Sequence, residues 1–278
     1  MFQTAAHSQI IRDQTLGVEH SIVTPQEFRD LIEGGAIRGS NLFHSFLEFN
    51  VNEGQNVYFA NPDGIANILT RVTGGSRSWI SGTLGVDGPA NFYLINPNGI
   101  HFGNNARLDV AGSFIATTAD GIKLGQQGLF SATEPEQSNL LTIQPGAFFT
   151  NALRQHQARQ RGLGGPPHSL LPQIRNQGNL AVASGQGLVL SGDLVTSTGS
   201  LVAPGGIVEI NGSQIGLWDN ASIDVSSPNG GGTVLIGTQQ TSRTFIAPNV
   251  EISANAIAKG NGGRVILQAD QITGFYGT

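Results

Sequence analysis

The feature that most constrains the fold is an internal repeat in the last hundred residues. Residues 220–236 and 249–267 both read as a short strand, a turn, Gly-Gly and a second strand. Two pairs of equivalent apolar residues define the spacing: Ile223 and Ile252, 29 positions apart, and Val234 and Val265, 31 positions apart. One such unit is too small to bury an apolar face alone, so consecutive units are expected to stack on one another.

The composition agrees with a chain built from many short strands. Gly accounts for 39 of the 278 residues and charged residues for only 12%. This fits tight turns and does not fit disorder, which goes with high charge and few apolar residues. The net charge of −5 disfavours binding to nucleic acid. No run reaches the roughly 18 apolar residues of a membrane span. Because cysteine is absent, no disulfide can hold the fold.

Short strands joined by small turns could build a propeller, a sandwich or a solenoid. A recurring Trp-Asp blade signature, typical of propellers, is absent. Sandwich strands usually alternate over longer runs. We therefore expect an all-β fold, a right-handed parallel β-helix, in which coils stack about 4.8 Å apart and inward residues form apolar columns.

We expect a single domain over residues 1–278, divided into four consecutive parts. These are an N-terminal cap (1–42), motif-bearing coils (43–136), a basic loop insertion (137–176) and further coils that continue beyond Thr278 (177–278). In the cap, Thr24-Pro25-Gln26-Glu27 is typical of a helix start and predicts a short helix ending by Gly34. The stretch 137–192 has no acidic residue but contains four arginines: Arg154, Arg159, Arg161 and Arg175.

Two near-identical turn motifs lie 35 residues apart. They are Asn61-Pro62-Asp63-Gly64-Ile65 and Asn96-Pro97-Asn98-Gly99-Ile100. Each predicts a type I turn, with Asn in the first position, Pro in the second, Asp or Asn in the third and Gly in the fourth. Turns with Pro-Asn also occur at 227–230 and 247–250. Turn chemistry alone is therefore typical of an ordinary coil corner, and in a folded turn the Asn side chains should satisfy backbone groups.

The sequence does not indicate a catalytic, metal or cofactor site. The 19 acidic residues are scattered, and Asp219 and Asp224 form the closest C-terminal pair. Glycoside cleavage and calcium binding both need clustered carboxylates. The six histidines lack metal-ligand spacing, and we expect His44 and His101 to be structural.

Four stretches of the chain carry a resemblance to a known family: Arg38–Phe46, Asn61–Ile65, Ile68–Gly74, and Asn96–Ile100 with Phe102-Gly103 after it. They resemble the N-terminal secretion domain of filamentous-haemagglutinin-type exoproteins, also called the haemagglutination activity domain, and the resemblance is strongest over 9–120. These exoproteins are the passenger proteins of two-partner secretion. The family has two hallmark motifs, Asn-Pro-Asn-Leu and Asn-Pro-Asn-Gly-Ile. The second is intact at 96–100, and the first is changed here to Asn61-Pro62-Asp63-Gly64.

The resemblance implies a β-helix with an N-terminal β cap and extra-helical strands, and a non-enzymatic secretion signal. Such a domain reaches the periplasm and is recognised in extended form by the periplasmic domains of an outer-membrane transporter. It then folds at the cell surface and nucleates the β-helix of a long passenger. Residues 61–65 and 96–100 are the expected recognition or folding motif. We expect a secreted monomer without cofactor, nucleic acid or membrane span. Met1-Phe2-Gln3-Thr4 lacks signal-peptide features, which fits a cytosolic chain or an exported protein whose signal has been removed. The resemblance implies the exported protein.

A second hypothesis stays open, in which the chain is a carbohydrate-binding or carbohydrate-active β-helix, or an adhesin domain. A groove with two or three convergent carboxylates would favour the carbohydrate-active form. The basic region at 137–192 is the candidate ligand surface under this hypothesis.

Overall fold

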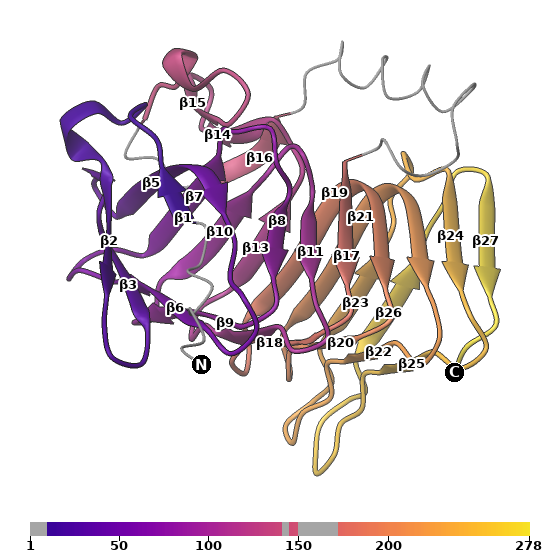
Figure 1. Cartoon of the computed structure of the whole chain (residues 1–278). Coiled ribbons are helices and arrows are strands. Elements are labelled where there is room, and N and C mark those ends of the chain that lie inside the picture. The colour runs from indigo at the N-terminus through magenta and orange to yellow at the C-terminus, as the bar shows by residue number, and fades with distance from the viewer. Residues whose placement is uncertain (1–9, 141–144, 150–171) are drawn as a thin grey trace, which may run out of the picture.

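The computed structural model describes residues 10–140, 145–149 and 172–278. In these residues the chain winds into a right-handed parallel β-helix whose coils stack from the N-terminal to the C-terminal end (Figure 1). The strands of the coils form three faces, called here face 1, face 2 and face 3. The predicted fold class is confirmed.

The strands of the three faces are as follows. Face 1 stacks β5 (Asn41–Phe49), β7 (Asn67–Val72), β10 (Asn91–Ile95), β13 (Phe114–Thr117), the first halves of β19 (Gly187–Ser197) and β21 (Ile207–Leu217), β23 (Thr233–Ile236) and β26 (Arg264–Leu267). Face 2 stacks β8 (Ser78–Ile80), β11 (Ile100–Phe102), β17 (Gln173–Asn176), the second halves of β19 and β21, β24 (Arg243–Ile246) and β27 (Ile272–Phe275). Face 3 stacks β3 (Asp30–Gly34), β6 (Asn56–Ala60), β9 (Thr83–Asp87), β12 (Arg107–Asp109), β18 (Asn179–Ala181), β20 (Ser200–Val202), β22 (Ser222–Asp224) and β25 (Glu251–Ser253).

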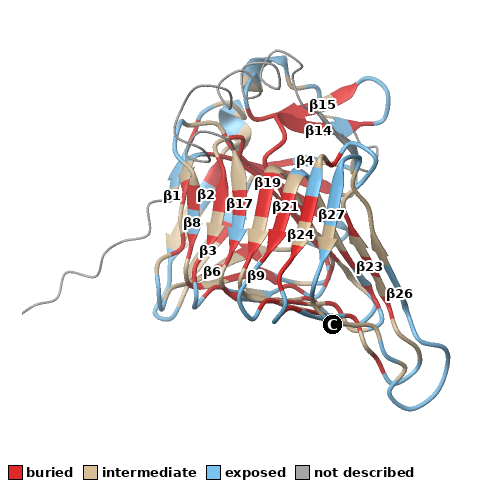
Figure 2. Ribbon diagram, turned by 90° about the vertical axis from the view of Figure 1, so that its right-hand side faces the viewer, coloured by how far each residue is buried: buried red, intermediate tan, exposed pale blue. Residues whose placement is uncertain are grey.

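The spacing of the internal repeat matches the register of the coils. Ile223 of β22 pairs with Ile252 of β25, and Val234 of β23 pairs with Val265 of β26. Inward residues in register form continuous columns, as expected. The face 1 column is Leu42, Ile68, Phe92, Phe114, Leu188, Val208 and Val234, all buried. Figure 2 shows these buried segments on the strands around the interior of the solenoid.

The N-terminal segment covers the exposed edges of the first coil. β1 (Ile10–Arg12) and β4 (Ala36–Arg38) pair antiparallel with β5, and β2 (Ser21–Pro25) pairs antiparallel with β3. The predicted helix from Thr24 is wrong, because Thr24 and Pro25 end β2 and Gln26 N donates to Arg29 O (2.8 Å) in a turn. Strand pairing of β2 with β3 outweighs the local capping preference. A 3₁₀ turn, η1 (Gly17–Glu19), lies in the same segment.

An antiparallel sheet interrupts the coils between β13 and β17 and packs outside face 1. It consists of β14 (Gly121–Leu124), β15 (Gly128–Ser131) and β16 (Pro145–Phe149), and a 3₁₀ turn, η2 (Pro135–Gln137), follows β15. Its side chains Ile122 and Phe130 form a second apolar cluster with Phe43, Leu69 and Ile95 of face 1. The β-helix resumes at β17, inside the range 137–176 that was expected to be a loop. Arg154, Arg159 and Arg161 lie outside the described residues.

Arg71 joins the cap, the coils and this outer sheet. Its side chain is fully buried, and its guanidinium donates four hydrogen bonds. The acceptors are Thr15 Oγ1 (2.7 Å), Ser45 Oγ (2.8 Å), Ser131 O (2.6 Å) and Ser138 Oγ (2.6 Å). Burial lowers the pKa of Arg71 to about 10. The guanidinium therefore stays charged near neutral pH, and its partners are needed to offset the cost of burying it.

Replacing Arg71 should strongly destabilise the domain. Arg71→Met removes four bonds to a charged donor and leaves several buried acceptors unpaired, so we expect a loss of about 3 kcal/mol or more. Urea denaturation of the purified chain measures this loss. Arg107→Met, at an exposed position of β12, is the matched control and should change the free energy of unfolding by about 0.5 kcal/mol at most. Similar small effects of both substitutions would contradict the role given to Arg71.

His44 is a buried histidine that faces the interior from β5. Its Nδ1 lies 3.0 Å from Ser21 Oγ, and its ring lies 5.1 Å from that of Phe59. Among the residues that the structure describes, Nε2 has no hydrogen-bond partner. Burial lowers the pKa of His44 to about 3, so the ring stays neutral in the folded state.

This buried histidine makes stability depend on pH. The folded pKa lies below the ordinary value of 6.5, so the unfolded chain binds the proton first as the pH falls. The free energy of unfolding should decrease between pH 6.5 and about 3, by at most about 1.4 kcal/mol per pH unit from His44. His44→Gln should flatten this slope in urea denaturation curves recorded across this pH range. Parallel curves for wild type and His44→Gln would contradict this expectation.

Candidate functional site

The second motif, Asn96–Ile100, forms the corner between β10 on face 1 and β11 on face 2. Gly99 N donates to Asn96 O (3.0 Å), so the turn begins at Asn96 as predicted. Asn98 N donates to the side-chain Oδ1 of Asn96 (2.9 Å). This Asx turn adds a second hydrogen bond within the same corner. Gly99 has a φ of +120°, which favours glycine at this place.

The two asparagine side chains of this motif tie it to the preceding coil. Asn96 Nδ2 donates to Ser76 O (3.1 Å) and Ser78 Oγ (3.0 Å), and Asn98 Nδ2 donates to Gly74 O (2.7 Å). Asn96 is fully buried, and only Asn98 of the five residues is partly exposed. The expectation that these amides satisfy backbone groups in the folded state is confirmed.

The first motif, Asn61–Ile65, lies at a different corner, between β6 on face 3 and β7 on face 1. Here the prediction of a turn beginning at Asn61 is wrong by one residue. Ile65 N donates to Pro62 O (3.1 Å), and Gly64 takes the left-handed third position with a φ of +82°. Both motifs have glycine in their fourth position, but the two glycines differ in conformation: Gly64 lies inside its turn with a φ of +82°, and Gly99 ends its turn with a φ of +120°.

The side chain of Asn61 still acts as a tie between coils. Its Nδ2 donates to Ile65 O (3.0 Å), and its Oδ1 accepts from Ala90 N of the next coil (2.9 Å). In contrast to the second motif, Pro62, Asp63 and Gly64 are exposed. The structure therefore places the two motifs at separate corners, one mostly exposed and one mostly buried.

A third set of asparagines, not singled out from the sequence, lies beside the first motif. Asn67 Nδ2 donates to Asn41 Oδ1 (3.0 Å), and Asn91 Nδ2 donates to Asn67 Oδ1 (3.0 Å). Ser113 N continues the ladder by donating to Asn91 Oδ1 (2.9 Å). Each asparagine begins a face 1 strand. The intervals of 26 and 24 residues were the sequence feature that could have revealed this ladder.

The described residues contain no group of three or more histidine, aspartate or glutamate side chains able to hold a metal ion. Among the helices of the described part, none is long and apolar enough to cross a membrane. The chemistry of both motifs is hydrogen bonding through carboxamides and turn backbone, without an acid, base or nucleophile at the second motif.

A family model described as the TPS secretion domain matches residues 8–267. The chain belongs to the TPS secretion domain family. Two heme/hemopexin-binding proteins of Haemophilus influenzae are 39% identical to this TPS domain, over 80 and 72 residues. These stretches cover 29% and 26% of the chain, but only 8% and 7% of the relatives. The matches therefore span a small fraction of much longer proteins.

Two solved structures resemble this TPS domain over nearly its whole length. They are the HMW1 secretion domain from Haemophilus influenzae and the filamentous hemagglutinin secretion domain. The TM-score is 0.46 for both, with sequence identities of 14% and 16%. The alignments cover 96% and 95% of this chain, and 99% of each of the other chains.

The different burial of the two motifs predicts different effects on stability. Asn96→Ala removes several hydrogen bonds and leaves buried partners unpaired, so we expect a loss of about 2 kcal/mol. Asp63→Ala, at an exposed turn position, should change the free energy of unfolding by about 0.5 kcal/mol or less. Urea denaturation measures the free energy of unfolding of both variants. Equal losses would show that the hydrogen bonds of the buried corner do not stabilise the domain as expected.

Proposed function

We propose that this TPS domain is a non-enzymatic secretion signal of a large exoprotein. In this proposal the periplasmic domains of a cognate outer-membrane transporter bind the domain in an extended state. The domain then folds at the cell surface and nucleates β-helix formation in the rest of the passenger. It acts as a monomer, without a cofactor.

The burial of the second motif is the observation that carries this proposal. In the folded domain the carboxamides of Asn96 and Asn98 point into contacts with Gly74, Ser76 and Ser78. Asn96 is fully buried, so a partner can bind its carboxamide only when the coil is open. An extended chain presents the same amides as free donors and acceptors, which suits recognition before folding.

Recognition and folding would then compete for the same hydrogen-bonding groups. A partner that binds the unfolded chain disfavours folding. Folding in turn buries the carboxamides in hydrogen bonds within the domain, so the partner no longer has access to them. Release from the transporter therefore needs no separate step, because closing the 74–78 and 96–100 corners removes the recognised surface. The first motif differs, since Pro62 and Asp63 stay exposed in the folded domain.

The scattered carboxylates support a role without catalysis. Glycoside cleavage uses a pair of carboxylates held close together, and the 19 acidic residues of this chain are scattered along the sequence. The buried asparagine corner instead fits a domain that is recognised before it folds and whose folding then nucleates the β-helix of the passenger.

A matched pair of substitutions separates recognition from stability. Asn96→Ala and Ser78→Ala both remove the Asn96–Ser78 hydrogen bond, but only Asn96→Ala changes the motif that the transporter would read. Export is measured as the ratio of domain in the medium to domain in the periplasm, in cells that carry the cognate transporter. Urea denaturation of each purified variant provides its stability.

We expect Asn96→Ala and Asn98→Ala to reduce export at least about tenfold, the effect of losing roughly 1.4 kcal/mol of binding. Ser78→Ala should be exported normally although it is destabilised. If export decreased in proportion to stability in all three variants, the motif would act through folding and the recognition proposal would be wrong.

A further inference from the structure

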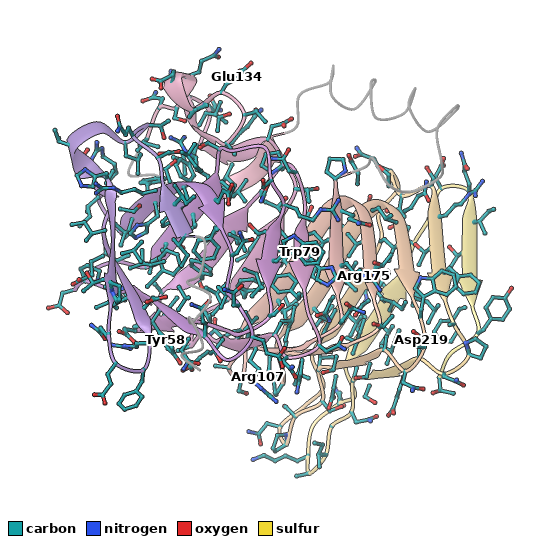
Figure 3. All side chains as sticks on the ribbon, in the orientation of Figure 1. Tyr58, Trp79, Arg107, Glu134, Arg175 and Asp219 are labelled. Atoms are coloured by element: carbon teal, nitrogen blue, oxygen red, sulfur yellow. The ribbon has the colours of Figure 1, made fainter. Side chains whose placement is uncertain are left out.

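The outer surface of face 2 carries two columns of side chains in register. One column runs through Trp79, His101, Arg175, Thr196, Gly216, Phe245 and Gly274. The neighbouring column runs through Gln173, Leu194, Gln214, Arg243 and Ile272, with Arg77 just before β8. We call this surface the face 2 strip. In Figure 3 its labelled members Trp79 and Arg175 lie near each other on the same side of the solenoid.

The face 2 strip is basic in a protein of net negative charge. Its columns contain Arg77, Arg175 and Arg243 and no acidic residue, although the whole chain has a net charge of −5. Two salt bridges occur among the described residues, Arg29–Asp87 and Arg38–Glu19, and neither lies on the strip. The three guanidiniums are thus without an ion-pair partner in the described part of the chain.

The lowered pKa of His101 agrees with a surface whose positive charges have no ion-pair partner among the described residues. Burial lowers the pKa of His101, and the charges of Arg175 and Arg77 lower it further. At neutral pH the ring is uncharged, so the positive charge of the strip comes from the arginines.

Aromatic rings lie at both ends of the strip. Trp79 is 48% exposed, and its ring centroid is 4.4 Å from that of His101. At the other end, the Trp218 ring stacks on Phe245 (4.4 Å, 23°), and Tyr276 lies 5.5 Å from Phe245 on its other side. Trp218 and Tyr276 are 42% and 62% exposed, so they present large ring surfaces to solvent.

Glycine makes this aromatic group possible. Gly216 and Gly274 flank Phe245 in the column, and the rings of Trp218 and Tyr276 fold back toward them. A Cβ at Gly216 would lie 2.3 Å from Nε1 of Trp218, so any side chain there would displace the ring. The exposed aromatic group therefore depends on glycine at positions 216 and 274 of the strands.

A hollow of about 450 Å³ adjoins the Trp79 end of the strip. It is lined by Glu48, Asn50, Gly75, Ser76, Arg77 and Trp79. In the hollow the Trp79 ring can stack on a sugar ring, and the Arg77 guanidinium can donate to hydroxyl or carboxylate oxygens. The Glu48 carboxylate can accept hydrogen bonds from hydroxyl groups only.

We propose that the face 2 strip binds a linear acidic polysaccharide, one whose sugars carry carboxylates. Guanidiniums pair with carboxylates through two parallel hydrogen bonds. The exposed rings present negative π faces to the weakly positive C–H groups of a sugar ring. The seven stacked strands have six spacings of about 4.8 Å, roughly 29 Å in all, which suits an extended ligand that lies along the solenoid. The five inner strands of the strip are paired on both sides, so a peptide strand could add only at the ends of the stack, at β8 or β27.

The test measures binding of the folded 278-residue chain to polygalacturonate by calorimetry. Neutral dextran and polyglutamate serve as the uncharged-sugar and acidic-peptide probes. The strip variant is Arg77→Gln/Arg175→Gln/Arg243→Gln. The control variant, Arg12→Gln/Arg107→Gln/Arg264→Gln, makes the same charge change at exposed positions off the strip. A second pair compares Trp218→Ala with Phe28→Ala, an aromatic residue that is 78% exposed in the cap.

We expect the strip variant to weaken polygalacturonate binding at least about tenfold, as loss of charge-assisted pairs should, while the control variant changes it less than about threefold. Trp218→Ala should weaken binding and Phe28→Ala should not. Equal losses in the two arginine variants would overturn the proposal in favour of unspecific charge attraction. Tighter binding to polyglutamate than to polygalacturonate would indicate an acidic peptide as the ligand and would contradict the proposal. Absence of binding to polygalacturonate would also contradict it.

Discussion

The stacking of each coil's backbone on the next is the interaction on which the rest of this structure depends. In a parallel β-helix the peptide groups of one coil find their partners mainly in the coils above and below, so no coil is stable alone. The same stacking aligns the inward residues into columns such as Leu42 to Val234. It also places polar residues of successive coils in register, and this produces the asparagine ladder and the face 2 strip.

The sequence predicts the solenoid well because the repeat length and the coil length are the same quantity. Ile223 and Ile252 recur at the coil period, and the structure pairs them directly. The prediction fails where a local preference competes with strand pairing: Thr24 looks like a helix cap and instead ends β2. Arg175 was grouped with a loop on charge alone, although it occupies a coil strand.

The candidate site was predictable in location but not in environment. Both Asn-Pro motifs are corners, as their turn chemistry indicates. Burial of Asn96 and exposure of Asp63 depend on which neighbouring coil covers each corner, and a single motif does not contain that information. The turn of the first motif begins one residue later than the turn of the second motif. The glycines of the two motifs differ in conformation, with a φ of +82° at Gly64 and +120° at Gly99, although the two sequences are similar.

The hydrogen bonds of Arg71 set a minimum size for the first cooperative folding unit. Its acceptors lie 56 residues before it at Thr15, and 60 and 67 residues after it at Ser131 and Ser138. A fragment that ends before Ser138 would leave the guanidinium at the face 1 surface with part of its coordination missing. The N-terminal half is therefore not a series of independently stable coils, because about half of the chain must assemble before this cation is fully paired.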